Sequence, residues 1–129
     1  MPNFYPGTET ALLFGLDERL GSELEGALRE QGREYLSEPW RRPGTEVARP
    51  GIKVVFCPAD RNYYRPLLDF IRQRGLKLPV VVVSGAPELT QWLDALDAGV
   101  ADYCSPPFES SQICWILDNT LKYRRLTAA

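Results

Sequence analysis

Four side chains lie where a fold of alternating strands and helices could use them for chemistry. Cys57 and Ser84 each follow an apolar, mostly β-branched run that is typical of a buried strand, and Asp17 and Asp60 lie a few residues beyond such runs. In open α/β sheets, ligands bind beside the carboxyl ends of the strands. A hydroxyl, a thiol and two carboxylates at that edge are suited to contact a phosphoryl group, to react as a thiolate or to hold a divalent cation.

The composition excludes several other kinds of site. The chain of 129 residues has no histidine, three cysteines without a Cys-x-x-Cys spacing, and a net charge of −2. It therefore lacks a histidine-based triad, histidine metal ligands and the cysteine pattern of a zinc site or disulfide framework. The glycine-rich phosphate loop and the nucleophile elbow are also missing. The charge gives no case for nucleic-acid binding, and no apolar run suggests a signal peptide or a membrane span, so we expect a cytoplasmic protein.

The segments that would position these residues alternate between strand and helix patterns. Strands are predicted at residues 10–14, 34–37, 52–57, 78–84 and 102–105. Helices are predicted from 17 or 18 to 32, from 66 to 75, from 87 to 98 and from 110 or 111 onward, with at most a turn or two at 45–49. This order predicts an α/β fold with a doubly wound, five-stranded parallel sheet. We expect one domain over residues 10–126, between a disordered lead-in at 1–9 and a tail at 127–129.

Residues 78–108 carry a more specific signal. The apolar run 78–83 leads to Ser84, a helical pattern ends in Ala98-Gly99-Val100, and Asp102-Tyr103-Cys104 precedes Pro107-Phe108. In this order and spacing the stretch resembles the second half of the receiver domains of bacterial two-component response regulators. The resemblance extends over residues 10–126 and implies their flavodoxin-like, CheY-like (βα)5 fold, a three-layer sandwich. It also implies a cis peptide bond between Pro106 and Pro107.

The resemblance also identifies the positions of a phosphorylation site, and most of these positions lack the residue type that the chemistry needs. Receiver domains phosphorylate one of their aspartates with the help of an acidic pair that binds Mg²⁺, a hydroxyl residue and a lysine. Gly15 and Leu16 stand at the positions of the acidic pair, Cys57 stands at the position of the aspartate, and Pro106 stands at the position of the lysine. Ser84 keeps the hydroxyl residue. We therefore interpret the chain as an atypical receiver, or pseudo-receiver, and expect neither Mg²⁺ nor another cofactor.

Without that reaction, the resemblance favours a protein-interaction or dimerisation module rather than an enzyme. In receiver domains the fourth helix, fifth strand and fifth helix form the face that pairs domains or docks partners, and Tyr103 resembles the switch aromatic of that face. The residues expected on it include aromatic side chains, which are common interface anchors: Trp92, Asp94, Asp97, Tyr103, Trp115, Asn119 and Tyr123. The alternative for Trp92 and Trp115 is partial burial in the core. Residues 122–126 resemble the point where many regulators continue into an output domain, so such a domain could follow residue 129.

Two further hypotheses depend on single residues. Cys57 could act as a redox- or ligand-sensing thiol if Arg61 or Arg65 lowers its pKa, and the alternative is an inert buried cysteine. Residual phosphorelay could use Asp60 or Asp17. The alternatives are that Asp60 is a solvated turn residue and that Asp17 only starts a helix.

Overall fold

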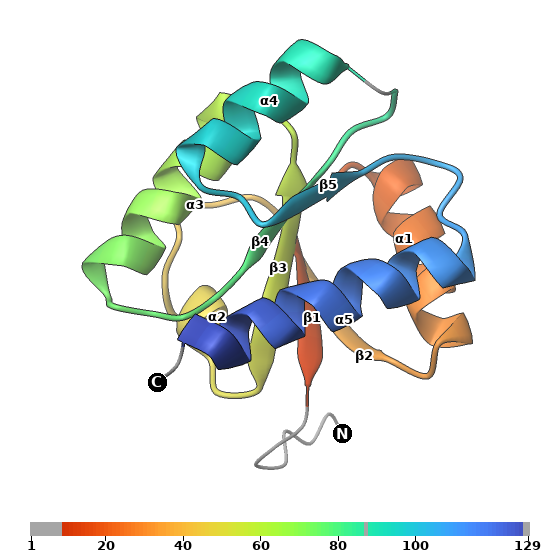
Figure 1. The fold of residues 1–129 in the computed structure, drawn as a ribbon, viewed down its shortest axis with the longest axis horizontal. Coiled ribbons are helices and arrows are strands. Elements are labelled where there is room, and N and C mark those ends of the chain that lie inside the picture. Colours follow the sequence, from red (N-terminus) through yellow and green to blue (C-terminus); the bar gives the residue numbers. More distant parts are fainter. Residues whose placement is uncertain (1–8, 87, 128–129) are drawn as a thin grey trace.

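The structure, a computed structural model, describes residues 9–86 and 88–127, and for residues 121–127 it describes the backbone only. The described residues form five strands and five helices in strict alternation (Figure 1). The strands are β1 (Thr10–Phe14), β2 (Glu34–Glu38), β3 (Ile52–Pro58), β4 (Val80–Val83) and β5 (Asp102–Cys104). The helices are α1 (Glu18–Glu30), α2 (Thr45–Ala48), α3 (Arg61–Gln73), α4 (Leu89–Ala98) and α5 (Ser110–Thr127). The lead-in at residues 1–8 lies outside the described residues, as does Pro87.

All five strands are parallel and lie in one sheet in the order β2-β1-β3-β4-β5. Alternate residues of the central strands point to opposite sides of this sheet. Leu12, Val55 and Val82 face a layer made by α2, α3 and α4. Leu13, Phe56 and Val83 face a layer made by α1 and α5. Because both faces are covered, β1 and β4 are buried along their whole length, as parallel strands require. This confirms the predicted doubly wound, three-layer (βα)5 fold.

The first turns of α3 were not predicted. The sequence places residues 58–65 in a loop and starts the helix at Pro66, but α3 begins at Arg61 and Pro66 lies inside it. The Asp60 carboxylate accepts a hydrogen bond from the Asn62 backbone N–H at 2.8 Å, which caps the helix start. Tyr64 is buried in the core and anchors this first turn. Capping and tertiary burial therefore outweigh the proline as a start signal.

The helix α4 covers the sheet less completely than its pattern suggests. Leu89, Trp92, Leu93 and Leu96 repeat at helical spacing, yet Ala95 is the residue of α4 that is fully buried. Trp92 is half-buried, and the three leucines are exposed. A short helix at the edge of the sheet therefore leaves an apolar stripe uncovered. Among the described residues, no helix combines the length and apolarity needed to cross a membrane.

Candidate functional site

The positions of the expected acidic pair lie directly after β1, and the first of them, Gly15, lies against an aromatic side chain. Gly15 has a φ of 82°, and its N–H donates to the Glu38 carbonyl oxygen at 2.9 Å. A Cβ added at Gly15 would lie 3.0 Å from the Cβ of Trp40, which is tighter than ordinary contact, and the positive φ also disfavours a side chain here. The Trp40 ring lies 4.9 Å from the Phe14 ring and 4.7 Å from the Tyr63 ring, measured between centroids. We call Phe14, Trp40 and Tyr63 the aromatic cap.

The two nearest carboxylates are used to start helices. Asp17 is the N-cap of α1, and its carboxylate accepts a hydrogen bond from the Leu20 N–H at 2.8 Å. Asp60 makes the corresponding bond at the start of α3. Each carboxylate therefore satisfies a backbone donor that the first helical turn leaves unpaired. Within the described part of the chain, no three histidine, cysteine or acidic side chains lie close enough together to hold a metal ion.

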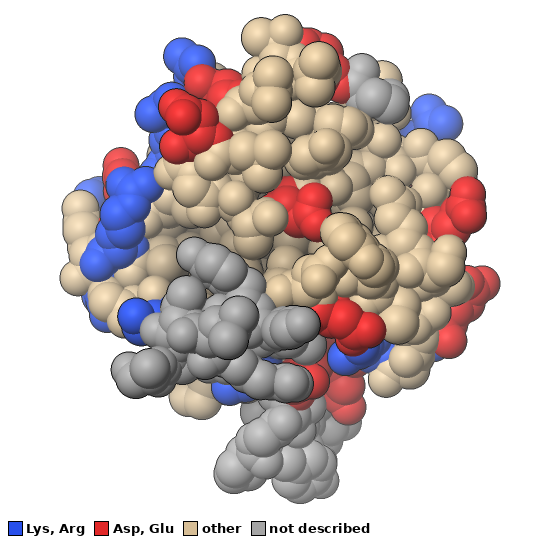
Figure 2. All heavy atoms as spheres, viewed as in Figure 1, with Lys and Arg blue, Asp and Glu red and all other residues tan. Residues whose placement is uncertain are grey.

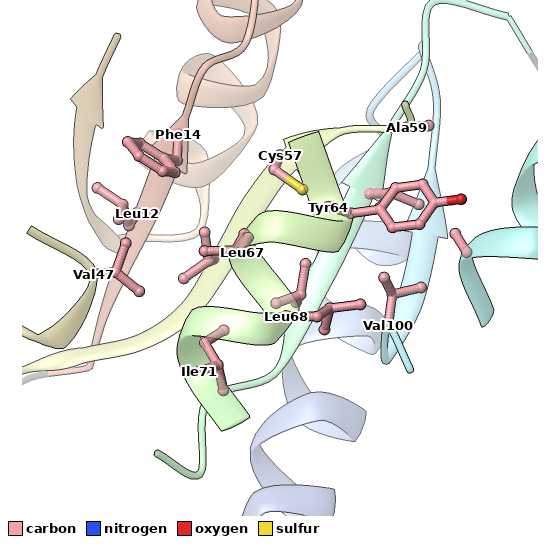
Figure 3. Packing of buried hydrophobic residues seen from close by; sticks show 14 of the residues in the cluster. Leu12, Phe14, Val47, Cys57, Ala59, Tyr64, Leu67, Leu68, Ile71 and Val100 are labelled. Atoms are coloured by element: carbon pink, nitrogen blue, oxygen red, sulfur yellow. The ribbon is translucent and has the colours of Figure 1, made fainter. Parts of the chain in front are cut away.

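Cys57 lies in the core rather than at the rim of the sheet. Its strand continues to Pro58, which pairs with Val83, so Cys57 is not the last residue of β3. Figure 3 shows its sulfur pointing toward α3, in the same layer as Tyr64 and Leu67. Burial removes water from the sulfur and raises the pKa of the Cys57 thiol. This environment favours the neutral thiol and gives no support to a reactive thiolate.

The two arginines expected to activate Cys57 bind another residue. Arg61 and Arg65 lie 2.9 and 3.6 Å from the Asp94 carboxylate, and the Tyr64 hydroxyl donates a hydrogen bond to the same group. The bond from Tyr64, followed by the arginine charges, holds the pKa of Asp94 below its ordinary value. Asp94 was predicted on the interaction face, but these contacts turn it toward α3. The Arg72 guanidinium also reaches α4, where it donates to the Ala98 carbonyl oxygen at 3.0 Å.

Ser84 is held by its neighbours. Its hydroxyl donates to the Ala86 carbonyl oxygen at 2.9 Å and accepts from the Trp92 indole N–H at 3.2 Å. The Trp92 ring stacks on Tyr103, with centroids 4.0 Å apart and planes 25° apart. The retained hydroxyl and the expected switch aromatic are therefore joined through one tryptophan. Beyond β5, the Pro106–Pro107 bond is cis, as the resemblance implies, and Pro106 itself carries no charge.

Comparison with solved structures identifies the fold. No protein-family model and no curated protein matches the sequence. Among solved structures, the signal receiver domain of a putative Luxo repressor protein from Vibrio parahaemolyticus matches 94% of this chain and 95% of its own, with a TM-score of 0.71 and 12% identity. A response regulator from Thermotoga maritima matches 89% of this chain and 98% of its own, with a TM-score of 0.72 and 19% identity. NtrX from Brucella abortus, in complex with ATP, matches 92% of this chain but 28% of its own, with a TM-score of 0.76 and 19% identity.

The chain has the receiver fold. The same fold occurs in separate receiver domains and as one part of the longer NtrX chain, of which this chain spans 28%. The three matches have at most 19% identity, so they establish the architecture and leave function to the site. In this receiver fold the positions Gly15, Leu16, Cys57 and Pro106 carry no charge.

The predicted interaction residues of this receiver fold lie in different environments. Trp92 and Tyr103 are half-buried against each other, whereas Trp115 is 63% exposed on α5, and Asn119 and Asp97 are exposed. The Tyr123 side chain lies outside the described residues.

Sequence reasoning missed the aromatic cap and the contacts of Asp94, which join residues 30 and 33 positions apart. For the aromatic cap, the local signal was the aromatic character of Trp40 and Tyr63.

Proposed function

We propose that this chain is a receiver-fold module of bacterial signal transduction that works by protein contact, without aspartyl phosphorylation and without Mg²⁺. The observation that carries the proposal is the aromatic cap. An acidic side chain at Gly15 would crowd Trp40 and strain the backbone, and aromatic rings lie beside the sheet edge where a metal ion would need oxygen ligands. On this basis we infer a binding protein rather than an enzyme.

The electrostatics of phosphoryl transfer support the same proposal. The reaction depends on metal ions and cations that stabilise charge on the transferred group. Cys57 and Pro106 supply neither a carboxylate acceptor nor a cation at their positions. Asp17 and Asp60, the remaining candidates for residual phosphorelay, each already accept a backbone hydrogen bond as helix caps.

The link between Ser84 and Tyr103 points to a switch that is held in one arrangement. Trp92 bonds to the Ser84 hydroxyl and stacks on Tyr103, so the hydroxyl cannot turn toward a phosphoryl group without breaking a contact. We infer that packing, rather than phosphorylation, sets the position of Tyr103. A partner would then bind a face made by α4, β5 and α5 that is always available. An output domain after residue 129 is one source of such a partner, and homodimerisation is another.

Incubation with acetyl phosphate and Mg²⁺ tests the proposal directly. Intact-protein mass spectrometry should show no added phosphoryl group under conditions in which a receiver domain with its aspartate and lysine is fully labelled. Asp60→Asn and Asp17→Asn are the matched variants. A mass gain in the parent chain that either variant abolishes would show that phosphorelay survives, and the proposal would then be wrong.

A further inference from the structure

A groove lies at the amino ends of β4 and β5, at the opposite end of the sheet from the aromatic cap. Its volume is about 670 Å³, and its walls come from α3, the end of α4, the starts of the two strands and α5, which can be followed in Figure 1. Pockets that hold small molecules have volumes of roughly 300–1,000 Å³. Gly15, Cys57, Ser84 and Pro106 do not line it, so the groove is separate from the positions of the phosphorylation site.

The walls of the groove are mostly apolar and come from segments that are far apart in the sequence. The apolar side chains that line it include Leu68, Ile71, Leu76, Leu78, Leu96 and Val100. Leu68, Ile71 and Val100 are 7%, 6% and 6% exposed, whereas Leu96 is 37% exposed. The groove therefore has a buried apolar inner surface and an open side, which suits the apolar body of a ligand.

The charged side chains that line the groove are basic. Among the described lining residues, Arg72 and Lys77 carry charge and none is acidic. The Arg72 guanidinium donates to the Ala98 carbonyl oxygen at 3.0 Å, which holds it beside the groove. Its ion pair with Asp69, at 3.1 Å, joins two side chains that are both more than half exposed, so this pair is weak. An anion in the groove could therefore take up Arg72 at little cost.

The acidic residues nearest in sequence do not reverse this charge. Four of them are neighbours of lining residues, but their side chains do not line the groove: Asp69, Asp97, Asp102 and Asp118. Asp118 lies 3.6 Å from Arg33, and the Asp102 carboxylate accepts a hydrogen bond from the Tyr103 N–H. Figure 2 shows basic side chains along the margin of the molecule on the side of α3.

The end of α5 adds further positive charge. The helix continues past Thr120, which lines the groove, to Thr127. Its last turns include Lys122, Arg124 and Arg125, whose side chains lie outside the described residues. Because all three are basic, they can only make this end of the molecule more attractive to an anion.

We propose that this groove binds a small amphipathic anion, with an alkyl or aryl body against the apolar walls and a carboxylate or phosphate head group on Arg72. A bare anion would leave the apolar walls in water, and a neutral apolar molecule would leave the basic side chains without a counter-charge from the ligand. The inference goes beyond the proposed function, because it concerns a small ligand and a different end of the sheet. Its failure would leave the proposal of a contact module unchanged.

Isothermal titration calorimetry of the full chain with matched octyl compounds tests this chemistry. Octanoate should bind at least about tenfold more tightly than octyltrimethylammonium, and added salt should weaken its binding. Acetate, which has the head group alone, should bind far more weakly than octanoate, and octyl phosphate shows which head group is preferred. Equal binding of octanoate and octyltrimethylammonium, or binding of no octyl compound, would overturn the inference.

Variants at the end of α3 locate the head group. Arg72→Gln should weaken octanoate by about tenfold, and Arg72→Lys should restore part of the loss. Arg74→Gln is the matched control, because the Arg74 guanidinium lies over the Phe70 ring, 4.9 Å from its centroid, and does not line the groove. Equal weakening by Arg72→Gln and Arg74→Gln would mean that net charge, and not the groove, attracts the ligand.

A change in the apolar wall gives an independent test that leaves the charges intact. Ala101→Phe should fill part of the groove and abolish octanoate binding, with circular dichroism as the check on folding. Amide chemical shifts on adding octanoate should change at Gly99 and Asn119 and stay constant at Ser84. Shifts confined to the rim would overturn the inference. Binding that appears only in Leu126→Ser would also overturn it, because the end of α5 would then be the occupant.

Discussion

At the carboxyl ends of β1 and β3, aromatic side chains cover the sheet, whereas along α4 three leucines are left in solvent. In most receiver domains we would expect a charged and hydrated pocket at this rim instead of aromatic rings. Here the rim carries packed aromatic rings, of which Phe14 is fully buried and Trp40 and Tyr63 are half-buried. The difference indicates that the rim contributes to stability, and we propose that the exposed side of α4 is the region available for binding.

The largest expected contrast is in thiol reactivity. Cys57 and Cys104 are buried, and burial raises the pKa of Cys104 to about 12, whereas Cys114 is half-buried on α5. Modification of the two buried thiols should wait for unfolding and be slower than that of Cys114 by on the order of a thousandfold or more. Titration with a chromogenic disulfide near neutral pH measures this. Cys114→Ser should remove the fast phase, and fast modification of Cys57 would restore the thiol-sensor hypothesis.

Truncation of the aromatic cap should destabilise the chain strongly. Phe14 is fully buried, so Phe14→Ala should lower the free energy of unfolding by about 3–5 kcal/mol. Leu93→Ala is the matched change on α4, and it should alter stability by no more than about 0.5 kcal/mol, because Leu93 is already exposed. Urea denaturation followed by circular dichroism compares the two. Similar losses of stability in the two variants would show that Leu93 is part of the core.

A smaller effect is expected where a carboxylate caps a helix. Asp60→Ala should lower the free energy of unfolding by about 1 kcal/mol, because the Asn62 N–H loses its acceptor. Asp69→Ala serves as the control, since Asp69 is exposed within the same helix. If Asp60→Ala were neutral in the same urea measurement, the cap would not explain why Asp60 lies at the rim.

The smallest expected change is at Asp102 of β5. Desolvation raises the pKa of Asp102, so its ionised form opposes folding. This unfavourable contribution is absent below the ordinary carboxyl pKa and grows as the pH rises through the raised folded value. Asp102→Asn should therefore stabilise the chain slightly near neutral pH and have no effect in strong acid. Urea midpoints at the two pH values test the sign, and a loss of stability near neutral pH would contradict it.

Local patterns predict most of the fold. The apolar run of β4, the capped start of α1 near Asp17 and the stop at Gly99 each follow from neighbouring residues, and these features fix the order of the elements. The cis bond at Pro106–Pro107 required the family resemblance. The start of α3 was missed because proline is a strong local signal, whereas the burial of Tyr64 depends on the assembled core.

The candidate site was harder to predict than the fold. Sequence positions showed that Gly15 and Cys57 lack charge, but they did not show what fills the pocket instead. Trp40 comes from the segment between β2 and β3, which has no periodic pattern, and it reaches Gly15 only after folding. The exposure of Leu93 was missed for a similar reason, since helical spacing identifies a stripe but not whether the sheet is wide enough to cover it.

The contacts between α3 and α4 fix the position of the helix that carries the exposed leucines. Arg61 and Tyr64 hold Asp94 in the middle of α4, and Arg72 holds the Ala98 carbonyl at its end. The exposed leucines of α4 therefore lie on a helix whose position is fixed by contacts with α3. A binder would meet a preorganised surface and would lose little conformational entropy in fixing it, so modest contact area could suffice for a specific complex.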